Sequence, residues 1–269
     1  MTDESRAEIP PSIGVFDSGL GGLSVLRALR EQLPGVPLLY LADSAHAPYG
    51  DRSTEFLTER SLAIGGYLMQ QGARLLVVAC NTATTQAVAA LRARWPELPI
   101  VGVEPGVKPA AAATRNGRIG VLATTATVRS ERFKHLVNSY AAGHQVIAQA
   151  CPGLVELIER GELDSPALRE LVERYCEPLR QAEVDTVVLG CTHYPFIRPL
   201  FQQALGSEVL IVDTEGAIAR QAARLWPASA PEAPAGTLRL STTGSVDLLA
   251  RFAAACLGWH DVTVGQAKP

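Results

Sequence analysis

Two cysteines with polar neighbours are the residues of this chain best suited to chemistry. Cys80 lies in Leu76-Val-Val-Ala-Cys-Asn-Thr-Ala83, and Cys191 lies in Asp185-Thr-Val-Val-Leu-Gly-Cys-Thr-His-Tyr-Pro195. In each stretch a short apolar run, typical of a buried strand, ends in a small residue directly before the cysteine. Because open α/β sheets bind their ligands at the carboxyl ends of the strands, we expect both thiols to lie where a ligand binds.

A pair of thiols that face one carbon atom from opposite sides suits one kind of reaction. One sulfur removes a proton from the carbon as a thiolate, and the other thiol returns a proton to the opposite face. This exchange inverts a stereocentre without a cofactor. A free thiol has a pKa of about 8.5, which helix amino termini and basic neighbours lower. Cys80 and Cys191 each precede a predicted helix start, and His193 lies two residues beyond Cys191.

Polar residues after other predicted strands would complete a site for a ligand that carries carboxylates. These residues are Asp17, Ser18, Asn81, Thr82, Thr124, Thr127 and Thr192. Their hydroxyls and the backbone N–H groups of nearby helix starts can hold a carboxylate. Gly19, Gly21 and Gly22 permit close approach of the backbone to a ligand. Asp17 is placed to meet an ammonium group or to assist a thiol.

These residues could have roles other than acid–base chemistry and ligand binding. Buried free cysteines often serve as small apolar fillers, which we expect of Cys176 and Cys256, while Cys151 suits either role. A zinc site could be built from Cys80, Cys191 and His193, but it lacks the close spacing of structural zinc sites. The loop 19–22 with Asp43 resembles the start of a dinucleotide fingerprint, but serine stands where the third glycine belongs. We therefore expect no metal and no cofactor.

Composition and charge exclude several classes of protein. The chain has 269 residues and a net charge of −3, and it contains no cluster of basic residues, which argues against a nucleic-acid partner. No apolar run approaches the roughly 20 residues of a membrane span. The amino terminus is polar and partly acidic, so no secretory signal is expected. Five cysteines without tight spacing predict reduced thiols and a cytoplasmic location.

The elements that must position these residues alternate between strand and helix. Strands are expected at 13–16, 38–42, 75–79, 100–103, 119–122, 145–148, 186–189, 209–212 and 238–241. Helices are expected at 23–33, from Ser53 or Thr54 to 71, from Thr82 or Thr84 to 95, and at 128–140, 165–182, 215–225 and 245–257. Residues 151–159 are expected to form a turn into a short helix. Residues 1–11 are expected to form a loose tail, and 227–236 a surface loop. This alternation predicts an α/β fold with mostly parallel sheets and helices on both faces.

The order of these elements repeats once along the chain. Ile13-Gly-Val recurs as Ile119-Gly-Val, and Cys80 recurs as Cys191 at a nearly equal distance. We therefore expect two similar three-layer α/β domains related by pseudo-symmetry, with the active site in the cleft between them. The alternative is a chance similarity of βα units.

Taken together, the motifs resemble those of the glutamate racemases in the cofactor-independent aspartate/glutamate racemase family. The matching stretches are Phe16-Asp-Ser-Gly-Leu-Gly-Gly22, Pro48-Tyr-Gly50, Ala79-Cys-Asn-Thr82, Gly102-Val-Glu-Pro105, Ala123 to Thr127, Ala150-Cys-Pro152 with Glu159, and Gly190-Cys-Thr-His-Tyr-Pro195. The resemblance implies interconversion of L- and D-glutamate, which supplies D-glutamate for peptidoglycan. It also implies a discontinuous first domain of residues 1–103 and 213–269, and a second domain of residues 104–212.

The same resemblance assigns roles to individual residues. It implies that Cys80 deprotonates D-glutamate, that Cys191 deprotonates L-glutamate, and that three neighbours assist the thiols: Asp17, Glu159 and His193. It implies that substrate is bound by four pairs of residues: Asp17-Ser18, Tyr49-Gly50, Asn81-Thr82 and Thr192-His193.

Two other functions are compatible with the same motifs. Aspartate racemase is the nearest rival, but aspartate relatives tend to carry an acidic residue at the position of His193. A non-catalytic amino-acid-binding protein, also built of two facing halves, is the second rival.

Family members form dimers, so a homodimer is expected. Relatives that need a peptidoglycan precursor as activator carry a longer amino-terminal extension, so the short tail here predicts no such requirement.

Overall fold

Two parallel β-sheets form the framework of the protein in a computed structural model, which describes residues 10–227 and 237–269. The first sheet has six strands, in the spatial order β10 (Thr263–Gln266), β9 (Leu238–Thr242), β2 (Leu38–Ala42), β1 (Ser12–Asp17), β3 (Ala73–Val78) and β4 (Ile100–Gly102). The second sheet has four, in the order β6 (Gln145–Ala150), β5 (Arg118–Ala123), β7 (Thr186–Gly190) and β8 (Leu210–Val212). All of these strand pairs are parallel, as predicted.

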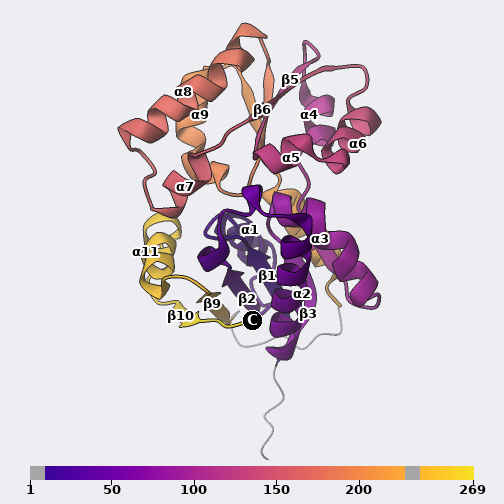
Figure 1. Cartoon of the computed structure of the whole chain (residues 1–269), viewed down its shortest axis with the longest axis vertical. Helices are drawn as coiled ribbons and strands as arrows, with labels where there is room; N and C mark the ends of the chain where they lie inside the picture. The colour runs from indigo at the N-terminus through magenta and orange to yellow at the C-terminus, as the bar shows by residue number, and fades with distance from the viewer. Residues whose placement is uncertain (1–9, 228–236) are drawn as a thin grey trace, which may run out of the picture.

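The two sheets confirm the internal repeat. The order β2-β1-β3-β4 in the first sheet matches β6-β5-β7-β8 in the second, with β1 and β5 in equivalent places. Cys80 follows β3 and Cys191 follows β7, so the two thiols occupy equivalent positions. Figure 1 shows the two halves stacked along the long axis, with β1–β3 in one half and β5–β6 in the other. Among the described residues, the strands β9 and β10 have no counterpart in the second sheet.

Helices cover both faces of each sheet, because the strands bury apolar side chains in both directions. On the first sheet, one face is covered by α2 (Thr54–Gln70) and α3 (Asn81–Arg94), and the other by α1 (Leu23–Gln32), α10 (Glu215–Leu225) and α11 (Val246–Leu257). On the second sheet, one face is covered by α4 (Val107–Ala113) and α6 (Glu131–Tyr140), and the other by α7 (Leu154–Glu159), α8 (Pro166–Gln181) and α9 (Arg198–Leu205).

One apolar core is shared by the two halves. A single cluster of buried side chains includes Val15 and Leu26 of the first half and Val187 and Phe201 of the second. At the junction, the rings of Phe196 and Phe252 meet edge to face with centroids 4.9 Å apart. Because each fully buried large apolar side chain contributes roughly 1.5–3 kcal/mol, this shared core stabilises the arrangement of the two halves that forms the cleft.

Helix starts follow the predicted capping residues in some places and differ in others. The side chains of Ser53 and Ser165 accept hydrogen bonds from Phe56 N and Leu168 N, so these serines, at which helix starts are expected, are the N-caps of α2 and α8. The prediction that α3 begins at Thr82 or Thr84 was wrong. Cys80 itself is the N-cap of α3, because its extended backbone leaves the sulfur free to accept from the first turn.

Three further elements differ from the sequence-based expectation. The single helix expected over 128–140 is two helices, α5 (Thr125–Arg129) and α6, because the Ser130 backbone is extended and its side chain caps α6. Helix α4 was not expected; it is a short run of alanines after Gly106. Strand β10 was not expected either, because Thr263–Gln266 has little apolar character and gains its order by pairing with β9.

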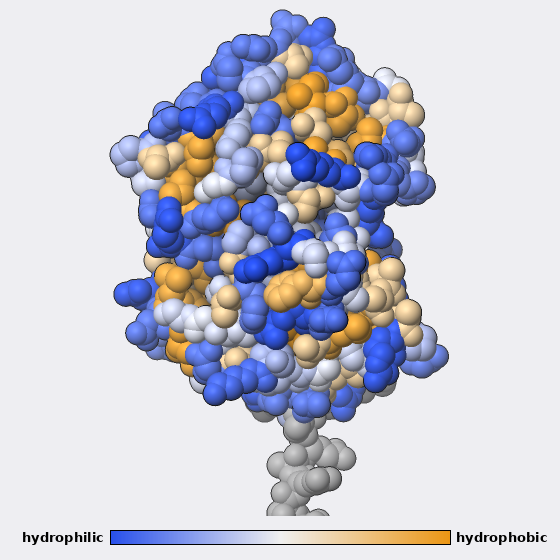
Figure 2. Space-filling model, viewed as in Figure 1, coloured by the Kyte–Doolittle hydropathy of each residue, from blue (hydrophilic) through white to orange (hydrophobic). Residues whose placement is uncertain are grey.

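The face of the molecule seen in Figure 2 shows hydrophilic side chains interspersed with apolar areas on both halves. Across the described residues, none of the helices combines the length and apolar character needed to cross a bilayer. Residues 1–9 of the expected tail and residues 228–236 of the expected surface loop lie outside the part of the chain that the structure describes.

Candidate active site

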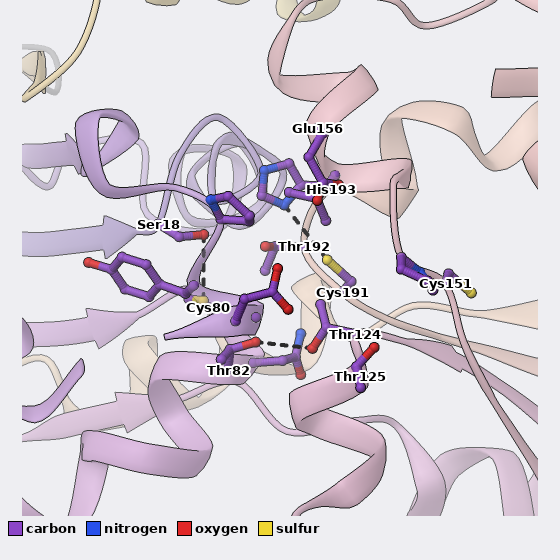
Figure 3. A pocket seen from close by; sticks show the side chains of 17 residues that line it. Ser18, Cys80, Thr82, Thr124, Thr125, Cys151, Glu156, Cys191, Thr192 and His193 are labelled. Carbon is purple, nitrogen blue, oxygen red and sulfur yellow. Dashed lines mark hydrogen bonds between the residues drawn. The ribbon is translucent and has the colours of Figure 1, made fainter. Parts of the chain in front are cut away.

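A pocket between the two halves contains most of the residues singled out in the sequence. The first half contributes Ser18, Pro48, Tyr49, Gly50, Asp51, Cys80, Asn81 and Thr82 to its lining. The second half contributes Thr124, Thr125, Cys151, Pro152, Val155, Glu156, Cys191, Thr192 and His193. Figure 3 shows Cys80 and Cys191 entering this pocket from the two halves, with Ser18 beside Cys80 and His193 beside Cys191.

The Cys80 thiol is held at the amino terminus of α3. Its sulfur accepts a hydrogen bond from Ala83 N at 3.4 Å and lies 3.8 Å from the Ser18 hydroxyl oxygen. Burial raises the pKa of the Cys80 thiol well above its usual value, and the nearby Asp17 carboxylate adds to this rise. The hydrogen bond from Ala83 opposes the rise. The raised pKa favours the protonated form of Cys80, which is able to donate a proton.

Asp17 lies directly behind Cys80 and is fully buried. Its carboxylate accepts hydrogen bonds from Gly22 N at 2.7 Å and from the Ser18 hydroxyl at 3.5 Å. Burial raises the pKa of the Asp17 carboxyl, although the positive charge of His193 opposes this. Ser18 thus links the carboxyl to the thiol, and a change in the charge of Asp17 changes the pKa of the Cys80 thiol.

Cys191 has a different set of neighbours. Its sulfur lies 3.7 Å from Nδ1 of His193, and Nε2 of the same ring lies 2.5 Å from Oε1 of Glu159. Burial alone would lower the pKa of His193, but the hydrogen bonds to Cys191 and Glu159 together raise it well above its usual value. The imidazole is therefore protonated at neutral pH, and it places a positive charge beside the Cys191 sulfur.

The glycine loop 19–22 makes room for this charged pair from the opposite half. A β-carbon added to Gly19 would lie 2.0 Å from Oε1 of Glu159, and one added to Gly21 would lie 2.3 Å from Nδ1 of His193. Leu20 N also donates to Oε1 of Glu159 at 2.5 Å. The sequence suggested that these glycines shape a carboxylate site. In the structure they are not among the residues that line the pocket, and they admit His193 and Glu159 into close contact with the first half.

Three threonines form a hydroxyl chain across the cleft. The Thr82 hydroxyl lies 3.1 Å from the Thr124 hydroxyl, which in turn donates to Thr127 at 3.0 Å. Thr82 and Thr124 line the pocket, whereas Thr127 is fully buried in the first turn of α5. Thr127 therefore supports Thr124 from behind.

Among the residues that the structure describes, no group of three or more histidine, cysteine, aspartate or glutamate side chains is arranged to hold a metal ion. Cys80 and Cys191 lie on opposite walls of the pocket, each with its own hydrogen-bonding partners. These partners are a hydroxyl and a carboxyl on one wall and an imidazole and a carboxyl on the other. The two thiols are therefore separate groups on opposite walls of one pocket.

The model of the Asp/Glu/Hydantoin racemase family matches residues 13–222, a span that includes both thiols and all their partners. The chain belongs to this family. A glutamate racemase of Pseudomonas aeruginosa is 54% identical over 219 residues, which cover 81% of this chain and 83% of the relative. A glutamate racemase of Pseudomonas putida is 50% identical over 256 residues, which cover 94% of this chain and 96% of the relative.

Solved structures of family members have the same fold. A glutamate racemase isoform of Bacillus anthracis has a TM-score of 0.87 and 31% sequence identity, and the match covers 96% of this chain and 97% of that one. The glutamate racemase of Escherichia coli, solved with L-glutamate and the activator UDP-MurNAc-Ala, has a TM-score of 0.84 and 34% identity over the same shares. The expected α/β fold of two facing halves is therefore confirmed.

The structure places the site residues predicted from the sequence in two groups. Those that line the pocket are Ser18, Tyr49, Gly50, Asn81, Thr82, Cys80, Thr124, Cys191, Thr192 and His193. Asp17, Glu159 and Thr127 do not line it but contact lining residues from behind.

Other lining residues were not expected from the sequence. Asp51, Thr125, Val155 and Glu156 belong to this group. Asp51 follows the match Pro48-Tyr-Gly50, Val155 and Glu156 follow Ala150-Cys-Pro152, and Thr125 lies within Ala123 to Thr127, so these matches are the signal that could have found them.

Proposed function

We propose that this chain is a glutamate racemase that interconverts L- and D-glutamate through Cys80 and Cys191, without a cofactor. The observation that carries the proposal is the pair of buried thiols at equivalent positions of the two halves, which enter one pocket from opposite walls. The close similarity to curated glutamate racemases supports glutamate, rather than aspartate, as the substrate.

The environments of the two thiols support an order of events. With His193 protonated beside it, Cys191 acts as a thiolate and removes the α-proton of L-glutamate. Cys80, whose raised pKa favours the protonated thiol, then donates its proton to the opposite face of the α-carbon and gives D-glutamate. The reverse reaction exchanges the two roles. Acid–base groups of this kind each contribute roughly 10²–10⁴-fold to the rate.

The pocket holds the substrate largely with neutral donors. Its polar lining includes the Ser18 and threonine hydroxyls, the Asn81 amide and the carboxylates of Asp51 and Glu156, and among the lining residues only His193 carries a positive charge. Asn81 is buried and its Oδ1 has no hydrogen-bond partner within the described structure, which makes it available to the ammonium group of a ligand. We assign substrate binding to Asp17-Ser18, Tyr49-Gly50, Asn81-Thr82, Thr124 with Thr127, and Thr192-His193.

We further propose the setting in which this activity operates. The enzyme supplies D-glutamate for peptidoglycan synthesis, acts in the cytoplasm and forms a homodimer. Its first domain comprises residues 1–103 and 213–269, and its second comprises residues 104–212. The membership of β9 and β10 in the first sheet supports this discontinuous boundary.

The test is hydrogen exchange by single-thiol variants in D₂O. We expect Cys80→Ala and Cys191→Ala each to lose racemisation by roughly 10²-fold or more. Cys80→Ala retains Cys191, so it should still exchange the α-hydrogen of L-glutamate and not that of D-glutamate. Cys191→Ala should show the opposite preference. Proton NMR with each enantiomer measures the exchange, and circular dichroism measures racemisation.

Cys256→Ala is the matched control, because this half-exposed thiol of α11 does not line the pocket and its loss should change neither reaction. Undiminished racemisation in either Cys80→Ala or Cys191→Ala would sink the two-thiol scheme. Faster turnover of aspartate than of glutamate by the unaltered enzyme would reject the assigned substrate.

A further inference from the structure

The first half carries a segment that the second half lacks. Strands β9 and β10 extend the first sheet beyond β2, whereas β6, the equivalent of β2, pairs only with β5 among the described strands. β9 runs parallel to β2 and ends at Thr242, level with Ala42. The residues after β9 therefore lie beside the residues after β2. The residues after β2 form the loop that leads to the pocket.

Thr243 is bonded to that loop through both its backbone and its side chain. Its backbone N–H donates to Ala42 O at 3.0 Å. Its hydroxyl donates to Oδ1 of Asp43 at 2.9 Å and accepts from Ala45 N at 3.1 Å. The contact is tight, since a β-carbon added to Gly244 would lie 2.9 Å from Cβ of Ser44. One hydroxyl thus satisfies both a carboxylate and a backbone N–H of the loop.

Asp43 connects Thr243 to the pocket wall, because it accepts hydrogen bonds from both Thr243 and Tyr49. Its buried carboxylate accepts from the Arg60 guanidinium at 2.7 and 2.8 Å and from the Tyr49 hydroxyl at 2.7 Å. Burial raises the pKa of Asp43, but the hydrogen bonds from Arg60 and Tyr49 outweigh it, so the pKa lies below its usual value. Asp43 is therefore ionised, and a bond to a charged acceptor holds more strongly than one between neutral groups.

Tyr49 is the residue through which the contact reaches the substrate. Together with Pro48, Gly50 and Asp51 it forms one wall of the pocket, which belongs to the first half. Its ring is buried, and its hydroxyl points to Asp43. The position of this wall thus depends on Asp43, and the position of Asp43 depends in part on Thr243.

We propose that Thr243 is a positioning residue for substrate binding, which ties the carboxyl-terminal strands to the Pro48–Asp51 wall through Asp43. This inference rests on the proposed role of that wall in binding glutamate. The thiols are held by β3 and β7 and their own partners, so the contact affects how substrate is bound more than how its proton is transferred.

The experiment compares steady-state kinetics of four variants in the full chain. Thr243→Val preserves shape and removes both hydroxyl bonds, and we expect KM for both enantiomers to rise roughly 5–20-fold with kcat changed less than about twofold. Thr243→Ser keeps the hydroxyl and should restore KM. Ser241→Ala is the matched control, because this hydroxyl of β9, two residues before Thr243, bonds Tyr40 O at 2.7 Å and not the loop. It should leave both constants unchanged.

Gly50→Ala distinguishes the positioning role of Thr243 from the substrate-binding role of the Pro48–Asp51 wall. Its β-carbon would meet only Thr124 Cβ at 3.8 Å, so the substitution alters the wall without disturbing the fold. A rise in KM for Gly50→Ala with none for Thr243→Val would overturn the positioning role and leave the wall in place. An unchanged KM in both variants would overturn the wall as a substrate site. An equal loss of kcat and thermal stability in Thr243→Val and Ser241→Ala would reduce Thr243 to a general stabilising residue.

Discussion

Replacing Glu159 with glutamine tests whether the charge behind His193 is needed. The amide oxygen of glutamine can still accept from both His193 Nε2 and Leu20 N, each 2.5 Å from Oε1 of Glu159 in the structure. The substitution therefore removes a negative charge and leaves the geometry in place. Because the His193 side chain is 2% exposed and that of Glu159 13% exposed, solvent and salt screen this pair weakly.

The expected magnitude follows from the type of hydrogen bond that is lost. A bond to a charged partner contributes about 1.5–3 kcal/mol and a neutral one about 0.5–1.5 kcal/mol, so the difference is about 1–2 kcal/mol. We expect kcat/KM to fall roughly 5–30-fold, since about 1.4 kcal/mol corresponds to a factor of ten. The fall must be equal in the two directions, because enantiomers have equal free energy and the equilibrium constant of racemisation is one.

The pH dependence provides an independent measurement. Glu159 helps to raise the pKa of His193, so in Glu159→Gln the imidazole loses its proton at lower pH and the loss of activity deepens as pH rises. A histidine whose pKa is raised by folding stabilises the fold. This stabilisation is fully present at pH values below the unfolded-state pKa of about 6.5, and it is lost as the pH rises through the folded-state pKa. Denaturant unfolding should therefore show a loss of about 1–2 kcal/mol at pH 6 that shrinks at alkaline pH.

Glu162→Gln is the control for this experiment, because Glu162 lies near Glu159 in the chain but pairs with Arg160 at the surface. It should leave the kinetics and their pH profile unchanged. If Glu159→Gln loses less than twofold in kcat/KM at every pH and its profile matches that of the unaltered enzyme, the charge on Glu159 has no role in the reaction.

Two further substitutions test single contacts. Gly21→Ala adds a methyl group 2.3 Å from Nδ1 of His193, so we expect displacement of the imidazole and a roughly 100-fold lower kcat. Gly35→Ala, which meets nothing within 4 Å, should be neutral, and equal kinetics for the two variants would contradict the steric argument. Ser53→Ala removes the N-cap of α2 and should cost about 1 kcal/mol in unfolding free energy with kcat/KM unchanged. An unchanged unfolding free energy would show that this cap is dispensable.

Features encoded locally were predictable from the sequence. Apolar runs that end in small and polar residues predicted the parallel strands, and the recurrence of Ile-Gly-Val and of a cysteine predicted the two similar halves. The same stretches contain Cys80, Cys191 and His193, so the thiols and the charged neighbour of one of them were found without a structure. Strand β10 and helix α4 were missed, because their order depends on pairing and packing and not on a local apolar pattern.

Contacts between distant segments were decided only by the tertiary structure. Glu159 meets Leu20, 139 residues away in the chain, and Thr243 meets Asp43, 200 residues away. No local pattern encodes such pairs, because they exist only when the two halves and the carboxyl-terminal strands pack together. The sequence by itself thus determined which groups can do the chemistry. The packing decided which of them face the ligand and which stand behind it, because a shared apolar core aligns the two strand ends across one pocket.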